Sequence, residues 1–94
     1  MSYARFGWDG SDVYVFTHVG GFIECCGCWL ADDDTEEYYH YASFQAYTTQ
    51  EMVDHLKKHE ETGHTVPSDV YDRLWEDHEE NMKFIEEKRN ENSI

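Results

Sequence analysis

Two stretches dominate this sequence: Cys25-Cys26-Gly27-Cys28 at residues 25–28 and His55-Leu56-Lys57-Lys58-His59 at residues 55–59. The first has the two-residue gap of a zinc knuckle, and its glycine permits the tight turn. The second places two histidines four positions apart, on one face of a helix. Thiolate and imidazole donors suit Zn²⁺ and exclude Mg²⁺ and Ca²⁺. The predicted ligands of a closed tetrahedral Zn²⁺ site are Cys25, Cys28, His55 and His59.

Two alternative ligands remain open. Cys26 is a third thiol, although its spacing to Cys28 is too short for the usual knuckle. His64 follows His59 at an allowed spacing, but the intervening Gly63 is predicted to end the helix, so the direction of the His64 side chain is open. A further interpretation treats the cysteines as core residues and the histidines as exposed.

Length and cysteine usage favour a metal over disulfides. A chain of 94 residues forms one small domain, whose modest core often needs a metal or disulfides for stability. The three cysteines fall within four residues, too close to form a disulfide framework. The N-terminus lacks the apolar run of a signal peptide, and no stretch approaches the roughly 18 apolar residues of a membrane span. We therefore expect a cytoplasmic protein in a reducing compartment, without membrane association.

The charge balance bears on the choice of partner. Seven basic and 21 acidic residues give a formal net charge of −14. Phosphate backbones would repel such a chain, because affinity for nucleic acids comes largely from Lys and Arg. The sequence therefore favours a protein partner with a basic surface over a nucleic acid.

The first part of the chain is typical of β-structure. Strands are predicted over residues 3–8, 12–19 and 22–24, separated by turns at Asp9-Gly10 and Gly20-Gly21. In the second of these strands, Val13, Val15 and Val19 are expected to share one face. Residues 38–44 form either another strand or an aromatic cover over the core.

The second part is predicted to be helical. Thr48 and Glu51 form a capping box before a helix over residues 49–62. A second, long helix is expected over about 69–90. Its apolar stripe packs on the sheet, mediates a homodimer or binds a protein partner. The predicted partner-binding residues of that stripe are Tyr71, Leu74, Trp75, Met82 and Ile85.

These elements predict an α+β fold, in which a zinc-stapled β-hairpin or meander precedes two helices. The domain organisation that we expect is a unit at 1–66 with an acidic insertion that contains the acidic loop at 32–37, followed by the amphipathic helix at 67–94. The order of knuckle, strand and helix resembles a β-β-α zinc finger, although the gap between Cys28 and His55 is far longer. Residues 24–28, 52–59 and 63–67 are also similar to small uncharacterised proteins of actinobacterial phages. That resemblance implies expression in a bacterial host and no known activity.

Three functions follow as expectations. The favoured function is a zinc-binding interaction module that modulates a host protein, and an alternative is a nucleic-acid mimic that inhibits a basic protein. DNA binding is disfavoured, because two of the three positions that would read bases in a finger, Glu51 and Asp54, are acidic. An enzyme is not expected. The helix lacks the glutamate of an HExxH motif, and four protein ligands leave no site for a water molecule.

Overall fold

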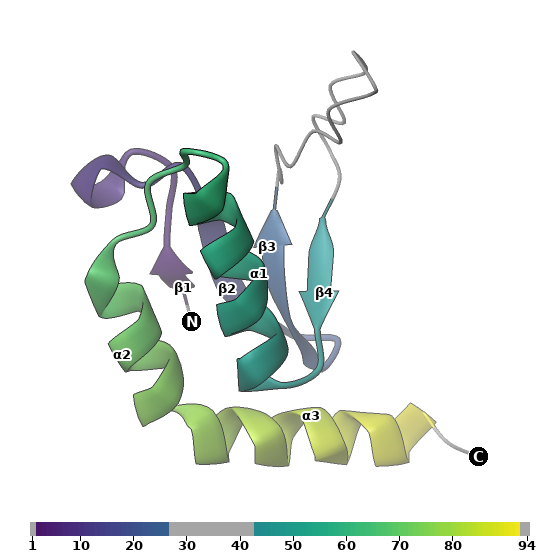
Figure 1. The fold of residues 1–94 in the computed structure, drawn as a ribbon. Coiled ribbons are helices and arrows are strands. Elements are labelled where there is room, and N and C mark those ends of the chain that lie inside the picture. The colour runs from purple at the N-terminus through teal and green to yellow at the C-terminus, as the bar shows by residue number, and fades with distance from the viewer. Residues whose placement is uncertain (1, 27–42, 93–94) are drawn as a thin grey trace.

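The computed structural model describes residues 2–26 and 43–92. Within these residues the chain forms a four-stranded antiparallel sheet in the order β1-β2-β3-β4, together with three α-helices (Figure 1). The elements are β1 Ser2–Ala4, the short 3-10 helix η1 Trp8–Gly10, β2 Tyr14–His18, β3 Phe22–Cys26, β4 Phe44–Ala46, α1 Thr49–Glu61, α2 Ser68–Glu76 and α3 His78–Asn92. The predicted α+β class is confirmed.

The first three strands lie where they were predicted but differ in length, and β4 overlaps the possible strand at 38–44 only at Phe44. β1 ends at Ala4 instead of Trp8, and the turn at Asp9 and Gly10 follows it with positive φ angles of 51° and 76°. β2 ends at His18, so the expectation that Val19 shares a strand face with Val13 and Val15 is wrong. Val19 lies in the turn before β3 and is 81% exposed.

Among the described residues, helices cover one face of the sheet, and we call the other face the open face. Val15 pairs with Cys25, and Ile23 pairs with Ala46, so these four side chains point the same way. All four are fully buried. The described helices contribute buried side chains such as Met52 to the same core. The core therefore lies between one face of the sheet and the helices.

The first helix begins and ends as predicted. The Thr48 side chain accepts a hydrogen bond from the Glu51 backbone N–H at 3.0 Å, which satisfies a free donor of the first turn. Gly63 follows the helix with a φ of 97°, a conformation that glycine adopts without steric cost. The capping box and the helix stop thus bracket a segment that packs against β3 and β4.

The long helix expected over 69–90 is two helices. α2 ends at Glu76, Asp77 has a φ of −92° and a ψ of 7°, and α3 leaves in a new direction across one end of the sheet (Figure 1). The Asp77 carboxylate accepts a hydrogen bond from the Tyr3 hydroxyl at 2.9 Å. Asn81 donates to the same hydroxyl at 2.9 Å. These bonds to Tyr3 of β1 stabilise the interruption between α2 and α3. The sequence at this point contains no proline or glycine that would predict it.

The apolar stripe of this region is largely inside the fold. Val70, Leu74 and Ile85 belong to the same buried cluster as the sheet. Because Leu74 is 0% and Ile85 1% exposed, a partner cannot reach either side chain. Tyr71 and Met82 are partly buried, and Trp75 is 43% exposed. Among residues 2–26 and 43–92, no helix is long and apolar enough to cross a membrane.

Candidate metal centre

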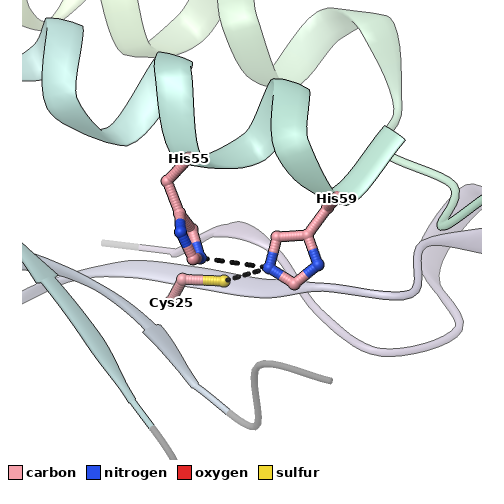
Figure 2. A group of neighbouring side chains, drawn as sticks. All are labelled: Cys25, His55 and His59. Atoms are coloured by element: carbon pink, nitrogen blue, oxygen red, sulfur yellow. Dashed lines mark hydrogen bonds between the residues drawn. The ribbon is translucent and has the colours of Figure 1, made fainter. Parts of the chain in front are cut away.

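Three of the predicted ligands meet between the sheet and the first helix. Cys25 lies on the covered face of β3, and His55 and His59 lie one turn apart on the face of α1 that packs against this strand. Figure 2 shows both imidazoles pointing from the helix toward the thiol. Their exposed fractions are 0%, 7% and 1%, respectively. The β3–α1 contact therefore brings together donors that lie 30 residues apart in sequence.

The three donor atoms converge on a common point. The Nε2 atoms of His55 and His59 are 3.0 Å apart, and the Cys25 Sγ lies 3.7 Å from the His59 Nε2. All three ligand atoms lie within 4.8 Å of one another. Tetrahedral Zn²⁺ with ordinary bond lengths places two nitrogens about 3.3 Å apart and a sulfur about 3.5 Å from a nitrogen. The observed separations are close to those of a metal-bound set, so the group can hold a metal ion.

An aromatic ring orients one of the histidines. Phe44 from β4 stacks on the His55 imidazole with a centroid distance of 3.9 Å and an interplanar angle of 5°. Phe44 pairs with Cys25 across the sheet, so it lies beside the thiol on the covered face. Stacking limits rotation of the His55 ring and keeps its Nε2 directed at the other donors.

The turn after α1 places His64 behind His59. The His64 backbone N–H donates to the His59 carbonyl at 2.9 Å, and the Gly63 N–H donates to the Glu60 carbonyl at 3.0 Å. These two bonds form a Schellman motif. The His64 Nδ1 then lies 2.8 Å from the His59 Nδ1, on the side of the ring away from Cys25. The geometry groups His55, and not His64, with Cys25 and His59.

The other two thiols differ in position. Cys26 follows Cys25 on β3, so its side chain points to the opposite face of the sheet. Its thiol donates to the Glu24 carboxylate at 3.3 Å. Cys28 lies outside the described residues, as do the acidic insertion and the possible strand at 38–42. Of the described cysteines, Cys25 is therefore the one directed at the histidines.

The chemistry of the donor set narrows the class of ion. One thiolate and two neutral imidazoles favour late first-row transition metals and disfavour the hard ions Mg²⁺ and Ca²⁺. Near-complete burial keeps bulk solvent and substrates away from the three donor atoms. Such enclosure is typical of a structural site and unlike an open catalytic one.

Comparison of the chain with protein-family models, curated proteins and solved structures finds no match. The centre is therefore interpreted from its own geometry. The elements β3, β4 and α1 follow one another in β-β-α order, with residues 27–43 between the strands. β1, β2, α2 and α3 lie outside that unit.

Two contacts of the site were not predicted from the sequence. The stacking of Phe44 on His55 depends on the pairing of β4 with β3, which no local pattern specifies. The contact between His64 and His59 does have a local signal. A glycine at the first position after a helix makes the Schellman motif the common ending, and that motif returns the next residue toward the last turn.

Proposed function

We propose that the chain is a zinc-stapled interaction module. Cys25, His55 and His59 are three ligands of a structural Zn²⁺, and Cys28 supplies the fourth. The metal joins β3 to α1, so that much of the folding free energy depends on metal binding. The observation that carries this proposal is the convergence of three buried donor atoms from two elements, at separations close to tetrahedral values.

A structural role is favoured over a catalytic one. Catalytic zinc needs an open coordination position and a nearby group that accepts a proton from bound water. Here all three donor residues are buried, and Phe44 stacks against His55. With Cys28 as a fourth ligand, no position remains for water. The metal then serves the fold, and the function lies on the surface that the fold displays.

Cobalt titration of the full chain tests the metal centre. Tetrahedral Co²⁺ with a thiolate ligand gives intense visible bands and a thiolate-to-metal charge-transfer band. We expect both bands at one equivalent, with Zn²⁺ displacing Co²⁺. Cys25→Ser and His59→Ala should weaken binding by more than the roughly 10–100-fold that loss of an outer hydrogen-bond partner causes.

The matched control is Cys26→Ser, which changes the neighbouring thiol on the other face of β3. We expect this variant to bind Co²⁺ like the natural chain. Removal of the metal with a chelator should abolish the far-ultraviolet circular dichroism of the fold. A chain that keeps its full signal after verified metal removal would falsify the structural-zinc proposal. Cys28→Ser should weaken binding as Cys25→Ser does, if Cys28 is the fourth ligand.

The partner that we propose is a protein with a basic surface. A net charge of −14 favours association with such a surface and opposes association with nucleic acids. The phage resemblance expected for residues 24–28, 52–59 and 63–67 implies a bacterial host, and we propose a protein of that host as the partner. Affinity capture with the zinc-loaded chain from a host lysate, followed by reconstitution with the purified partner, tests this proposal.

A second candidate function is mimicry of a nucleic acid, which the charge specifically supports. Exposed carboxylates would occupy the phosphate-binding surface of a basic protein. Competition decides between the two functions. A mimic is displaced by duplex DNA or RNA and loses affinity steeply as salt rises, because its contacts are largely screened charges. Binding that is unchanged between low and high salt would contradict mimicry.

A further inference from the structure

The face of the sheet opposite the metal centre carries a continuous row of aromatic rings. Successive ring centroids along this row are 5.7, 5.5, 6.0, 4.4 and 6.0 Å apart. We call this row the ring ladder. Its members, in spatial order, are Phe6, Tyr14, Phe16, His18, Phe22 and Tyr47.

The strand register places the ladder on the open face. Tyr14 pairs with Cys26, and His18 pairs with Phe22, whereas Val15, Ile23 and Cys25 at alternate positions belong to the buried core. The strand members of the ladder are partly exposed. At its two ends, Phe6 is 51% and Tyr47 41% exposed. So large an aromatic surface on one face of a small domain is typical of a binding site.

Carboxylates accompany these rings. Glu24 lies directly opposite Phe16 across the β2–β3 pair and beside Gln45 of β4, in the middle of the open face. At the end of the ladder, the Glu51 carboxylate accepts a hydrogen bond from the Tyr47 backbone N–H at 3.2 Å. The open face therefore combines aromatic rings with negative charge.

Positive charge is concentrated elsewhere. Six of the seven Lys and Arg residues lie on α1, α2 and α3. Lys88 approaches the turn between β2 and β3, but its ammonium group pairs with Glu91 at 3.2 Å. The seventh, Arg5, places its guanidinium 4.9 Å from the centroid of the Trp8 ring. An anionic aromatic surface with few cations of its own is complementary to arginine.

We infer that the ring ladder binds an arginine-bearing, extended segment of the partner protein. This inference rests on the proposed interaction function and assigns its surface. Guanidinium groups stack on aromatic faces and pair with carboxylates, and Glu24 lies within the ladder to receive one. An extended segment presents every second side chain to the face, as the rows of a sheet do.

Two other occupants are disfavoured by charge. Single-stranded nucleic acid also stacks on aromatic platforms, but such sites line the backbone path with Lys and Arg, which this face lacks. A second copy of the chain would bring two surfaces of the same sign together, with Glu24 of each copy facing the other.

Peptide binding to the zinc-loaded full chain tests the inference. The probe is a synthetic ten-residue peptide of alternating Arg and Thr, titrated by calorimetry at low and physiological salt. We expect saturable binding, with the Lys–Thr version several-fold weaker. Phe16→Thr removes a central ring and keeps a residue that suits a strand, and it should lower the affinity for the Arg–Thr peptide by about 3- to 30-fold. Glu24→Gln retains the side-chain volume and should also weaken binding.

Phe84→Gln is the matched control, because it removes a partly exposed aromatic ring on α3 and should leave peptide affinity unchanged. Circular dichroism and the cobalt spectrum of each variant establish that the fold and the metal centre are intact. Failure of the zinc proposal would appear in that spectrum, whereas failure of this inference would appear in the peptide titration alone.

Four results would overturn the inference. The first is that the natural chain does not bind the peptide, and the second is that the Phe16→Thr and Glu24→Gln variants bind it as tightly as the natural chain does. The third is that a ten-nucleotide oligothymidine binds more tightly than the peptide. The fourth is that the chain forms a dimer that Phe16→Thr dissociates.

Discussion

His59 connects the metal centre to the end of its helix. Its Nε2 faces Cys25 and His55, and its Nδ1 faces the His64 Nδ1 at 2.8 Å. A neutral imidazole that offers Nε2 to a metal carries its proton on Nδ1. That proton is then donated to His64. Such a bond selects the tautomer and the ring orientation of a metal-ligating histidine. The Schellman motif at Gly63 holds His64 in place for this contact.

We therefore predict that His64→Ala lowers the affinity for Co²⁺ by about 10- to 100-fold while the tetrahedral spectrum is retained. His64→Gln keeps a hydrogen-bond acceptor near the His59 Nδ1 and should restore part of the loss. The measurement is a competitive Co²⁺ titration against a chelator of known affinity. Loss of the tetrahedral spectrum in His64→Ala would instead make His64 a ligand, and an unchanged affinity would remove it from the centre.

The pKa of Tyr3 determines how its contribution to the stability of the fold changes at high pH. Burial raises the pKa of Tyr3 above its ordinary value of 10.0, and the neighbouring Asp77 carboxylate raises it too. Because the folded pKa is the higher one, the neutral phenol contributes its full stability below pH 10. That contribution is lost as the pH rises through the folded pKa. Burial and the hydrogen bond to Glu60 also raise the pKa of Tyr71, so both groups act in the same direction.

The free energy of unfolding should therefore fall above pH 10, as measured by urea titration of the zinc-loaded chain. Tyr3→Phe should cost about 1–3 kcal/mol at pH 8, because Asp77 and Asn81 lose their shared partner. The difference in free energy of unfolding between Tyr3→Phe and the natural chain should become smaller as the pH rises. If the free energies of unfolding of the two proteins instead fall in parallel with pH, ionisation of Tyr3 does not cause the loss of stability.

At the scale of elements, local signals specified α1 better than α2 and α3. Thr48, Glu51 and Gly63 are local determinants, and the helix begins and ends where they predict. The break at Asp77 has no such signal, because its neighbours Glu76 and His78 are compatible with a continuous helix. It arises from contacts with residues distant in sequence. The Tyr3 hydroxyl bonds Asp77 at the break and Asn81 in α3, and the His78 Nδ1 lies 2.7 Å from the Thr49 hydroxyl.

The candidate site, like the helices, was predictable where local signals determine it and not where contacts between distant residues do. The spacing of His55 and His59 on one helix face follows from helical geometry. Their approach to a strand that carries Cys25 was expected from the ligand pattern of a Zn²⁺ site and not from helical geometry. The alternation of β3 also separates Cys25 from Cys26, although the sequence alone does not say which of the two faces the helix. That choice depends on the register between β2 and β3, which is a property of the whole sheet.

The docking of α3 gives a prediction with an internal control. Gly21 and Gly63 share a φ of 97°. A Cβ at Gly21 would lie 2.4 Å from the Lys88 Cβ, whereas a Cβ at Gly63 would meet nothing within 4 Å. Both alanine variants incur the cost of a left-handed residue, about 1–2 kcal/mol. Gly21→Ala should cost about 1–3 kcal/mol more, because α3 must shift.

Urea unfolding of the zinc-loaded variants measures this difference. Amide exchange should localise the extra loosening in Gly21→Ala to α3, while α1 and the strands keep their protection. Equal stabilities of the two variants would mean that α3 is not held at Gly21 as described.

At the scale of the whole molecule, the sheet separates two chemistries. One face carries the thiol of Cys25 against the helix histidines, and the other carries the ring ladder with Glu24. Neighbouring residues of β3 alternate between the two, so a single strand connects the metal centre to the open face. Metal loss should therefore disorder the strand on which the ladder is built. Binding of a partner to the ladder is then expected to depend on zinc, although no ladder residue is a ligand.

The net charge predicts opposite effects of salt on the fold and on its complexes. A charge of −14 on 94 residues produces self-repulsion that is stronger in the compact state than in the unfolded chain. Salt screens it, since the Debye length falls from about 30 Å at 0.01 M to about 3 Å at 1 M. The zinc-loaded chain should therefore melt at a higher temperature in 0.5 M than in 0.01 M NaCl. A gain of about 1 kcal/mol would raise the midpoint by about 4–8 °C.

Neutralisation of exposed carboxylates by Glu86→Gln and Glu87→Gln, which lie beyond the first turn of α3, should reproduce part of that gain at low salt and reduce the further effect of NaCl. The same salt increase should weaken binding of the arginine peptide, because attraction between opposite charges is screened as repulsion is. Calorimetry of folding and of binding in the same buffers compares the two trends. A melting temperature that falls with NaCl would show that attractive ion pairs outweigh the net charge. Ion pairs within the fold would then contribute more to its stability than self-repulsion costs.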